Sequence, residues 1–372
     1  MSISTGSMAG EGSMAGEGSM AGEGSMAGEG SRTAAAVAST ALVRAARRRP
    51  RRRLWWVLAG LAVALIALFW LRVLGGDYTI TFGDFWRIVF GKQIPGATFI
   101  LTESKLPRAC ESVLVGVALG VGGAIFQTTL RNPLASPDVI GVSMGASAAA
   151  VLGIVVWSAS GWDLAVLALV GAVGTSLLVR SLAGNGAGQR LVLVGVTVAA
   201  GLSAVIQYLF TRADVYDAQL ALRWMTGSVS DASWPTIRVL AVVLVVLLPA
   251  TALAARSARA LELGDEVAAG LGVGQRRADV LLLCGVLLVA AATAAAGPVA
   301  FVAFVAGPIS RALNGGRVTF AGAALVGGAV TVAADYVGAY AFHDVNLPVG
   351  VVTGAFGAPF LLWLLTVSRR SA

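Results

Sequence analysis

Residues 105–148 read KLPRACESVLVGVALGVGGAIFQTTLRNPLASPDVIGVSMGASA and carry the most specific pattern in the chain. After a basic, proline-marked start it becomes an apolar run that contains Gly116, Gly120 and Gly123. These glycines lie three or four residues apart, so they share one face of a helix. Small residues on one face allow helices in lipid to approach closely. The stretch therefore predicts a membrane helix packed tightly against a neighbour.

A rigid turn and a second helix follow in the same stretch. The prolines of the segment 132–137, NPLASP, favour a turn, and Gly141 and Gly145 then begin another run with a small-residue face. The pattern predicts two membrane helices joined by a short connection.

The composition of the chain places it in the membrane. Of its 372 residues, 57% are hydrophobic and 12% are charged, which is too few charges to coat a soluble globule. The net charge of +8 could suggest nucleic acid, but the basic residues cluster at the ends of apolar runs, as membrane topology requires. We predict an all-α polytopic membrane protein that contacts membrane lipid and no nucleic acid.

The N-terminal region differs from the rest of the chain. Residues 7–30 are four copies of SMAGEG, whose low hydrophobicity and abundant glycine predict disorder. The basic stretch 44–53, RAARRRPRRR, is typical of a cytoplasmic anchor before a first span, with nucleic-acid binding as the alternative. We therefore expect a disordered cytoplasmic segment at 1–53 and a transmembrane domain at 54–370.

The transmembrane domain contains ten apolar runs of about the length that crosses a bilayer. Arginines are concentrated in alternate connections, so an even number of spans with both termini in the cytoplasm satisfies the charge rule. Gly307 and Pro308 interrupt the eighth run, which we do not expect to cross as a simple helix. The predicted spans are 54–74, 109–130, 139–157, 163–180, 191–210, 237–255, 279–296, 299–313, 319–338 and 347–367.

Ionisable residues are sparse within these runs. Asp335 is the one deeply placed carboxylate, and it is either a functional group or, as we favour, a hydrogen-bonded residue that fixes helix packing. Glu111 follows Arg108 by three residues and could pair with it on one helix face. The sequence thus offers no obvious ion-coupling site.

Motifs for chemistry are also missing. The two lysines, Lys92 and Lys105, are not part of a GK[ST] phosphate-binding loop. The one histidine, His343, is in a short loop, and Cys110 and Cys284 are in or beside apolar runs. We predict no catalytic residues, no cofactor and no metal site.

A long charged interruption, AARSARALELGDEVAAGLGVGQRRAD, lies between the sixth and seventh runs at 255–279. Its acidic residues 262, 265 and 266 suit the start of a helix, and glycines end it. Such an element is expected where a protein outside the membrane docks; an ordinary solvated loop is the alternative.

The order and spacing of KLPR, a glycine-rich span, NPLASP and GVSMGA resemble the iron-siderophore and cobalamin permeases, the FecCD family of ABC importers. The resemblance extends over residues 50–370 and includes AAAGPVAFVAFVAGPISR and LPVGVVTGAFGAPFLLWLL near the end. It implies a type II ABC importer permease fold in a bacterial cell membrane. It also implies three partners: a second permease chain, an ABC ATPase dimer and an extracytoplasmic substrate-binding protein.

The resemblance also assigns roles to single residues. Lys105 and Arg108 would dock the binding protein, with a membrane-interface anchor as the alternative. Asn132 and Leu134 would form a cytoplasmic gate, with a simple turn as the alternative. The cytoplasmic coupling segment is expected at 256–278. Its ATPase contacts would be Leu261, Gly264, Asp265, Glu266, Ala269 and Gly272, and the translocation path would include Ser203, Gln207 and Thr353.

The substrate is indicated by residues 223–234, RWMTGSVSDASW, which resemble the subgroup that handles ferric catecholate siderophores. We therefore favour import of ferric siderophore over that of cobalamin or haem. An ion-coupled secondary transporter is a weaker alternative because it needs coupling-ion ligands at unwound helices. A purely structural membrane subunit would leave the charged interruption unexplained.

Overall fold

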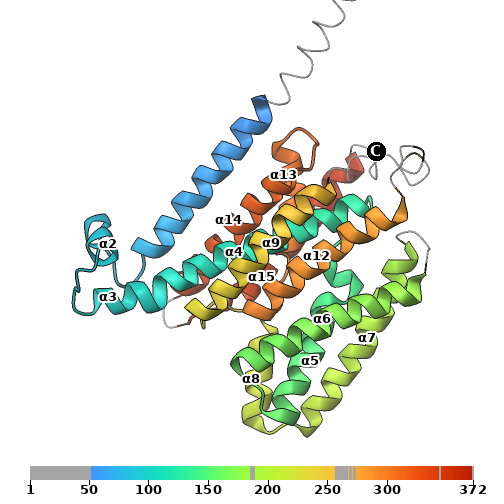
Figure 1. Ribbon diagram of the computed structural model, residues 1–372, viewed down its shortest axis with the longest axis horizontal. Helices are drawn as coiled ribbons and strands as arrows, with labels where there is room; N and C mark the ends of the chain where they lie inside the picture. The colour runs from blue at the N-terminus through green and yellow to red at the C-terminus, as the bar shows by residue number, and fades with distance from the viewer. Residues whose placement is uncertain are drawn as a thin grey trace, which may run out of the picture. The chain divides into compact units, whose positions relative to one another are not determined.

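The computed structural model describes residues 52–184, 189–255, 267, 270, 274–342 and 345–370 (Figure 1). The chain divides into two units, Met1–Leu54 and Trp55–Ala372. Every regular element in the described ranges is helical. This agrees with the predicted all-α polytopic fold.

A helix occupies each of the ten predicted spans, with ends that differ by a few residues. Seven helices of the described chain are long and apolar enough to cross a membrane; the shorter apolar helices are Val142–Trp157, Val302–Leu313 and the Val349–Leu362 part of the last helix. The helices are Arg52–Leu74, α4 (Leu106–Thr129), α5 (Val142–Trp157), α6 (Gly161–Ala183), α7 (Gln189–Arg212), α9 (Trp234–Ala254), α12 (Gln275–Ala296), α13 (Val302–Leu313), α14 (Phe320–Tyr340) and α15 (Val349–Arg370).

Helix α4 is the centre of one helix group and packs against α9, α12, α13 and α14 (Figure 1). A Cβ atom on Gly116 or Gly120 would overlap backbone atoms of α14, and one on Gly123 would overlap the carbonyl of Ala303 in α13. The predicted close-packing face is therefore confirmed. Glycine is required on this face because the neighbouring backbones occupy the space of a side chain.

The short helix α13 shows why its proline does not break it. Pro308 has no N–H, so the carbonyl of Phe304 in the preceding turn lacks its usual helical donor. The Gln127 side chain of α4 supplies one: its Nε2 donates to that carbonyl at 2.9 Å. We expected a short span here, which is confirmed, but the expected interruption at Gly307 and Pro308 is wrong, because the helix continues to Leu313.

A second group consists of α5, α6, α7 and α8 (Val215–Met225), which lie together in Figure 1. Gly145 of α5 faces Gly171 and Thr175 of α6 so closely that a Cβ atom would overlap them. Gly141, which precedes α5, has φ +81°, a value that glycine adopts without strain. The sequence prediction of a close-packing face at the start of this helix is confirmed.

Several short elements were not predicted. Before α4 lie α2 (Phe82–Val89), α3 (Ala97–Phe99) and a π-helical turn at Ile100–Lys105. In the π turn the N–H of Leu106 bonds the carbonyl of Leu101, five residues back. Pro107 follows directly and lacks an N–H, so the change of helix type falls where regular bonding is already interrupted.

Candidate functional site

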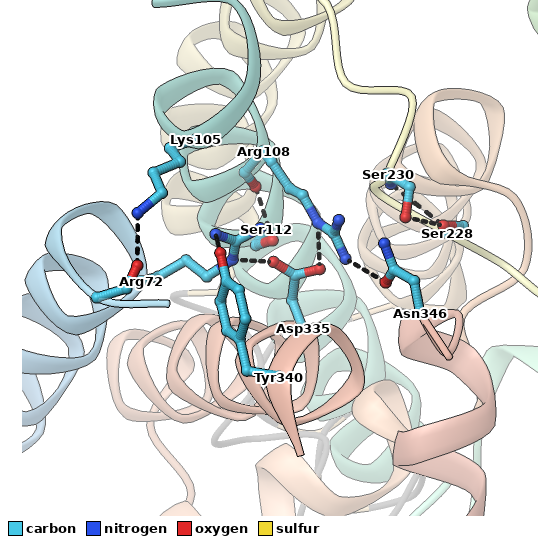
Figure 2. A network of polar contacts seen from close by, with 10 residues as sticks. Arg72, Lys105, Arg108, Ser112, Ser228, Ser230, Asp335, Tyr340 and Asn346 are labelled. Carbon is cyan, nitrogen blue, oxygen red and sulfur yellow. Dashed lines mark hydrogen bonds and ion pairs between the residues drawn. The ribbon is translucent and has the colours of Figure 1, made fainter. Parts of the chain in front are cut away.

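A buried group of charges joins the helix Arg52–Leu74, α4 and α14. It lies where α4 begins and α14 ends. The carboxylate of Asp335 accepts from Arg72 Nε at 2.6 Å and from Arg108 Nε at 2.7 Å. Tyr340 accepts from Arg72 at 3.1 Å, and Asn346 accepts from Arg108 at 3.2 Å (Figure 2). We call these five residues the ion cluster.

The ion cluster is buried, and the cost of burying charge therefore determines its energetics. The Asp335 side chain has no exposed surface, and those of Arg72 and Arg108 are 3% and 9% exposed. A buried carboxylate is tolerated only when its oxygens are bonded, and here each oxygen receives one guanidinium. These bonds agree with the interpretation of Asp335 as a residue that fixes helix packing.

Lys105 lies beside the ion cluster and is 4% exposed. Its Nζ donates to the backbone carbonyls of Gly75 and Tyr78, each at 2.5 Å. The π turn ends at Lys105, and the two carbonyls belong to the segment that follows the helix Arg52–Leu74. The lysine thus ties the start of α4 to that segment (Figure 2).

The expected pairing of Arg108 with Glu111 is wrong, because Arg108 Nε pairs with Asp335 of α14 instead. Glu111 is 1% exposed, and its Oε2 atom has no hydrogen-bond partner in the described chain. The local spacing placed both groups on one helix but could not show that a residue 227 positions away is the better partner.

The gate residues predicted after α4 form a compact turn. Asn132 Oδ1 accepts from the N–H of Leu134 at 2.9 Å, and the Asn132 carbonyl accepts from the N–H of Ala135 at 3.0 Å. Asn132 is exposed and Leu134 is half-buried. The turn geometry is that of an asparagine bonding its own backbone two residues on. The gating role stays a prediction.

The predicted path residues lie in two different helix groups. Ser203 and Gln207 share a face of α7, with Gln207 Nε2 3.4 Å from Ser203 Oγ, and Gln207 is exposed. Thr353 of α15 is buried, and its hydroxyl donates to the carbonyl of Val349 at 3.0 Å. It lines a cavity of about 380 Å³ between α13, α14 and α15. Helix α7 packs against α5 and α6, whereas α15 packs against α13 and α14.

The predicted ATPase contacts Leu261, Gly264, Asp265, Glu266, Ala269 and Gly272 lie outside the described residues, as do His343 and the SMAGEG repeats. The ends of the helices on either side are described. Arg180 of α6 donates to both oxygens of Asp279 in α12, at 2.9 and 3.0 Å. This ion pair, which sequence reasoning missed, fixes the start of α12 just beyond the predicted coupling segment.

Comparison with known proteins identifies relatives along nearly the whole chain. The profile of the FecCD transport family matches residues 36–367. The ferric enterobactin transport system permease protein FepG of Escherichia coli is 38% identical over 86% of this chain and 98% of its own length. The achromobactin transport system permease protein CbrC of Dickeya dadantii is 38% identical over 83% and 91% of the two chains.

Solved structures agree with these relatives. A transporter assigned to the metal-chelate type of ABC transporters, in an inward-facing conformation, superposes with a TM-score of 0.72 at 25% identity, covering 84% of this chain and 99% of that one. The PsaBC complex of Streptococcus pneumoniae shares the fold, with a TM-score of 0.53 and 14% identity over 75% of this chain and 94% of that one. From its apolar helices, its sequence relatives and its fold, the chain is a multi-pass membrane protein that belongs to the FecCD transport family.

Proposed function

We propose that the chain is the transmembrane permease subunit of an ATP-driven ABC importer that carries ferric siderophore across a bacterial cell membrane into the cytoplasm. One observation carries the proposal: a ferric enterobactin permease matches over 98% of its own length. The achromobactin permease and an iron(3+)-hydroxamate permease of Bacillus subtilis, at 38% and 32% identity, support a siderophore as the substrate class. The ferric complex is the cargo of the permease and not a resident metal.

The exposed face of α7 supports a second permease chain as a partner. Leu193, Val196 and Tyr208 are all exposed on this helix, as is Gln207. Apolar residues on a membrane helix can face lipid, but the polar pair Ser203 and Gln207 on the same helix favours a wet interface. We propose that the translocation path forms where this face meets a second permease chain, with Thr353 contributing from α15.

A separate ATPase dimer would supply the energy through the coupling segment 256–278. The described ends of α9, at Ala254, and α12, at Gln275, bracket this segment. The Arg180–Asp279 ion pair links α6 to α12 at the C-terminal end of this segment. A movement of the segment would therefore also move α6 and α12. We propose that both termini and this segment lie in the cytoplasm.

An extracytoplasmic binding protein would dock at the opposite end, where the ion cluster lies. In this structure Lys105 and Arg108 are buried and donate to groups of the same chain. A binding protein could therefore contact their charged ends only after those bonds part. The docking role of these two residues stays a prediction, as does the gating role of Asn132 and Leu134.

Transport by a reconstituted complex tests the proposal. The chain is placed in vesicles with its partner permease, its ATPase and its binding protein, and uptake of ⁵⁵Fe-labelled ferric siderophore is followed. We expect uptake that requires ATP and the binding protein, with no uptake of cobalamin or haem. Uptake of cobalamin alone would contradict the proposed siderophore substrate. Accumulation of ferric siderophore by the single chain under an ion gradient would contradict the proposed ATP-driven mechanism.

The coupling role has its own test in the same vesicles. Glu266→Gln and Gly272→Val should leave ATP hydrolysis by the complex unchanged and lower uptake of ferric siderophore, because the ATPase dimer would no longer move the permease. Arg317→Gln, a change in another connection, serves as the matched control. Normal uptake in both coupling variants would argue against the assignment of the segment.

A further inference from the structure

A groove opens between three membrane helices, beside the ion pair between Arg223, at the end of α8, and Asp231, in the connection to α9. Its walls are the first turns of α6 and α9, and its floor is the last turns of α12. Helix α12 packs against both α6 and α9, so it bridges the two walls. The groove has a volume of about 480 Å³, within the roughly 300–1,000 Å³ range of small-molecule sites.

Below its rim the groove is apolar, and it is about one leaflet deep. Leu164, Val166 and Leu169 line one wall, and Val239 and Val243 line the other. The α6 lining runs from residue 161 to 169, which at 1.5 Å per residue is about 12 Å. Half of a hydrocarbon core of about 30 Å is about 15 Å. The depth therefore suits a chain that enters from one membrane surface and ends near the midplane.

The rim of the groove carries one charge of each sign. Arg223 donates to both oxygens of Asp231 at 3.1 Å, and the two side chains are 61% and 79% exposed. Ser228 and Ser233 add hydroxyl groups beside them. These residues lie where α6 and α9 begin and α12 ends, the level of the headgroups for a spanning helix.

Two tryptophans lie at the same level. Trp162, in the first turn of α6, is 49% exposed, and Trp224 lines the groove from the end of α8. Tryptophan is enriched where the hydrocarbon meets the headgroups. The groove therefore runs from an interfacial rim into the hydrocarbon layer.

We propose that this groove binds a glycerophospholipid of the bilayer, with one acyl chain in the groove and an ethanolamine headgroup at the rim. The phosphate of that headgroup would accept hydrogen bonds from Arg223, which has five N–H donors. Its primary ammonium would donate to Asp231. A choline headgroup carries the same charges but has no N–H to donate, so the rim selects ethanolamine over choline by hydrogen bonding and not by charge.

Photocrosslinking of the unmodified full-length chain tests the position of the lipid. Phosphatidylethanolamine with a diazirine in the middle of one acyl chain is added to the purified chain, and the crosslinked peptides are mapped. We expect crosslinks concentrated on the groove-lining turns of α6, α9 and α12. Crosslinks spread equally along α7 would mean an ordinary lipid shell and would overturn the proposal.

Retention of lipid by variants tests the rim, with native mass spectrometry as the readout. Arg223→Gln combined with Asp231→Asn should lower retained phosphatidylethanolamine about threefold to tenfold, since about 1.4 kcal/mol corresponds to tenfold. The matched control is Asp84→Asn with Arg87→Gln, which removes another exposed ion pair of the chain. Equal retention by the two double variants, or equal retention of phosphatidylcholine by the wild type, would overturn the proposal.

A substitution that fills the groove with a side chain provides a second comparison of lipid retention. Ala294→Phe places a ring on the groove floor, whereas Val170→Phe places one on an exposed position of α6 outside the groove. Only the first should lower retention. Two results would assign the groove to another occupant and contradict the lipid proposal. One is displacement of the photolipid by ferric siderophore, and the other is crosslinking of a second copy of the chain through the groove. The crosslinking pattern and the lipid retention of the variants do not depend on whether the chain imports siderophore.

Discussion

Helices α4 and α7 have the same length, 24 residues, but different surroundings. In the apolar stretch of the span that contains α4, 78% of the residues are buried by the chain itself, whereas in that of α7 the share is 17%. A Cβ atom on Gly123 of α4 would overlap a neighbouring backbone, and one on Gly201 of α7 would meet nothing within 4 Å. The first helix is the chain's own core, and the second presents a surface for lipid or a second permease chain.

This contrast implies that substitutions on the two helices should affect different properties. Changes at α4 and its partners should lower the stability of the single chain, because close packing and buried charges are involved. Changes on the open face of α7 should leave stability alone and alter transport. The following four variants test the contrast, from the largest expected effect on stability to the smallest.

Asp335→Asn should cause the largest loss. The variant leaves two buried arginines without their carboxylate, and breaking a buried ion pair from one side costs about 3–5 kcal/mol. Thermal unfolding in detergent, followed by loss of the folded monomer, measures the effect. A melting temperature equal to that of the wild type would show that the ion cluster does not hold α4 and α14 together.

Gly123→Ala should destabilise the chain by about 1–3 kcal/mol, since overpacking forces neighbouring elements apart. The added methyl would overlap the carbonyl of Ala303. The matched control is Gly201→Ala on α7, where the methyl has open space and alanine favours the helix. If both variants melt alike, the proposed difference between the two helices is wrong.

Asp279→Asn should have a smaller effect, at most about 1 kcal/mol, because its ion pair with Arg180 is about one third exposed on each side. Melting of this variant beside Asp335→Asn compares a partly exposed carboxylate bonded to one arginine with a buried carboxylate bonded to two. A loss of stability as large as that of Asp335→Asn would show that burial does not determine how much the loss of a carboxylate destabilises the chain.

The double variant Ser203→Leu with Gln207→Leu should change stability least, within about 0.5 kcal/mol, since surface substitutions rarely do more. Uptake of ferric siderophore should nevertheless fall, because the polar face of α7 is proposed to line the path. Parallel melting and uptake measurements separate the two outcomes. Normal uptake would remove both residues from the path.

Much of the fold could be predicted from the sequence, because hydrophobic runs and glycine spacing are local signals. All ten spans are helical, and the close-packing faces of α4 and α5 were found from their glycines. The short helices α2 and α8 were missed because they are too short to give a membrane-span signal.

The ion cluster could not be predicted, for a different reason. Arg72 and Asp335 are 263 positions apart, and no periodicity links residues on separate helices. Local spacing instead suggested Glu111 as the partner of Arg108, which is wrong. Similarly, the hydrogen bond from Gln127 to the Phe304 carbonyl depends on the packing of α4 against α13. Neither segment alone has a sequence pattern that predicts it.

The π turn at Ile100–Lys105 makes the N-terminal approach to α4 sensitive to insertions and deletions. A π turn amounts to one extra residue in an α-helix, and each helical residue turns the chain by about 100°. Loss of a single residue here could restore ordinary helical bonding, but everything upstream would rotate relative to α4. The carbonyls of Gly75 and Tyr78 would then move away from Lys105. Homologues that keep this lysine contact are therefore expected to conserve the length of the segment more strictly than its composition.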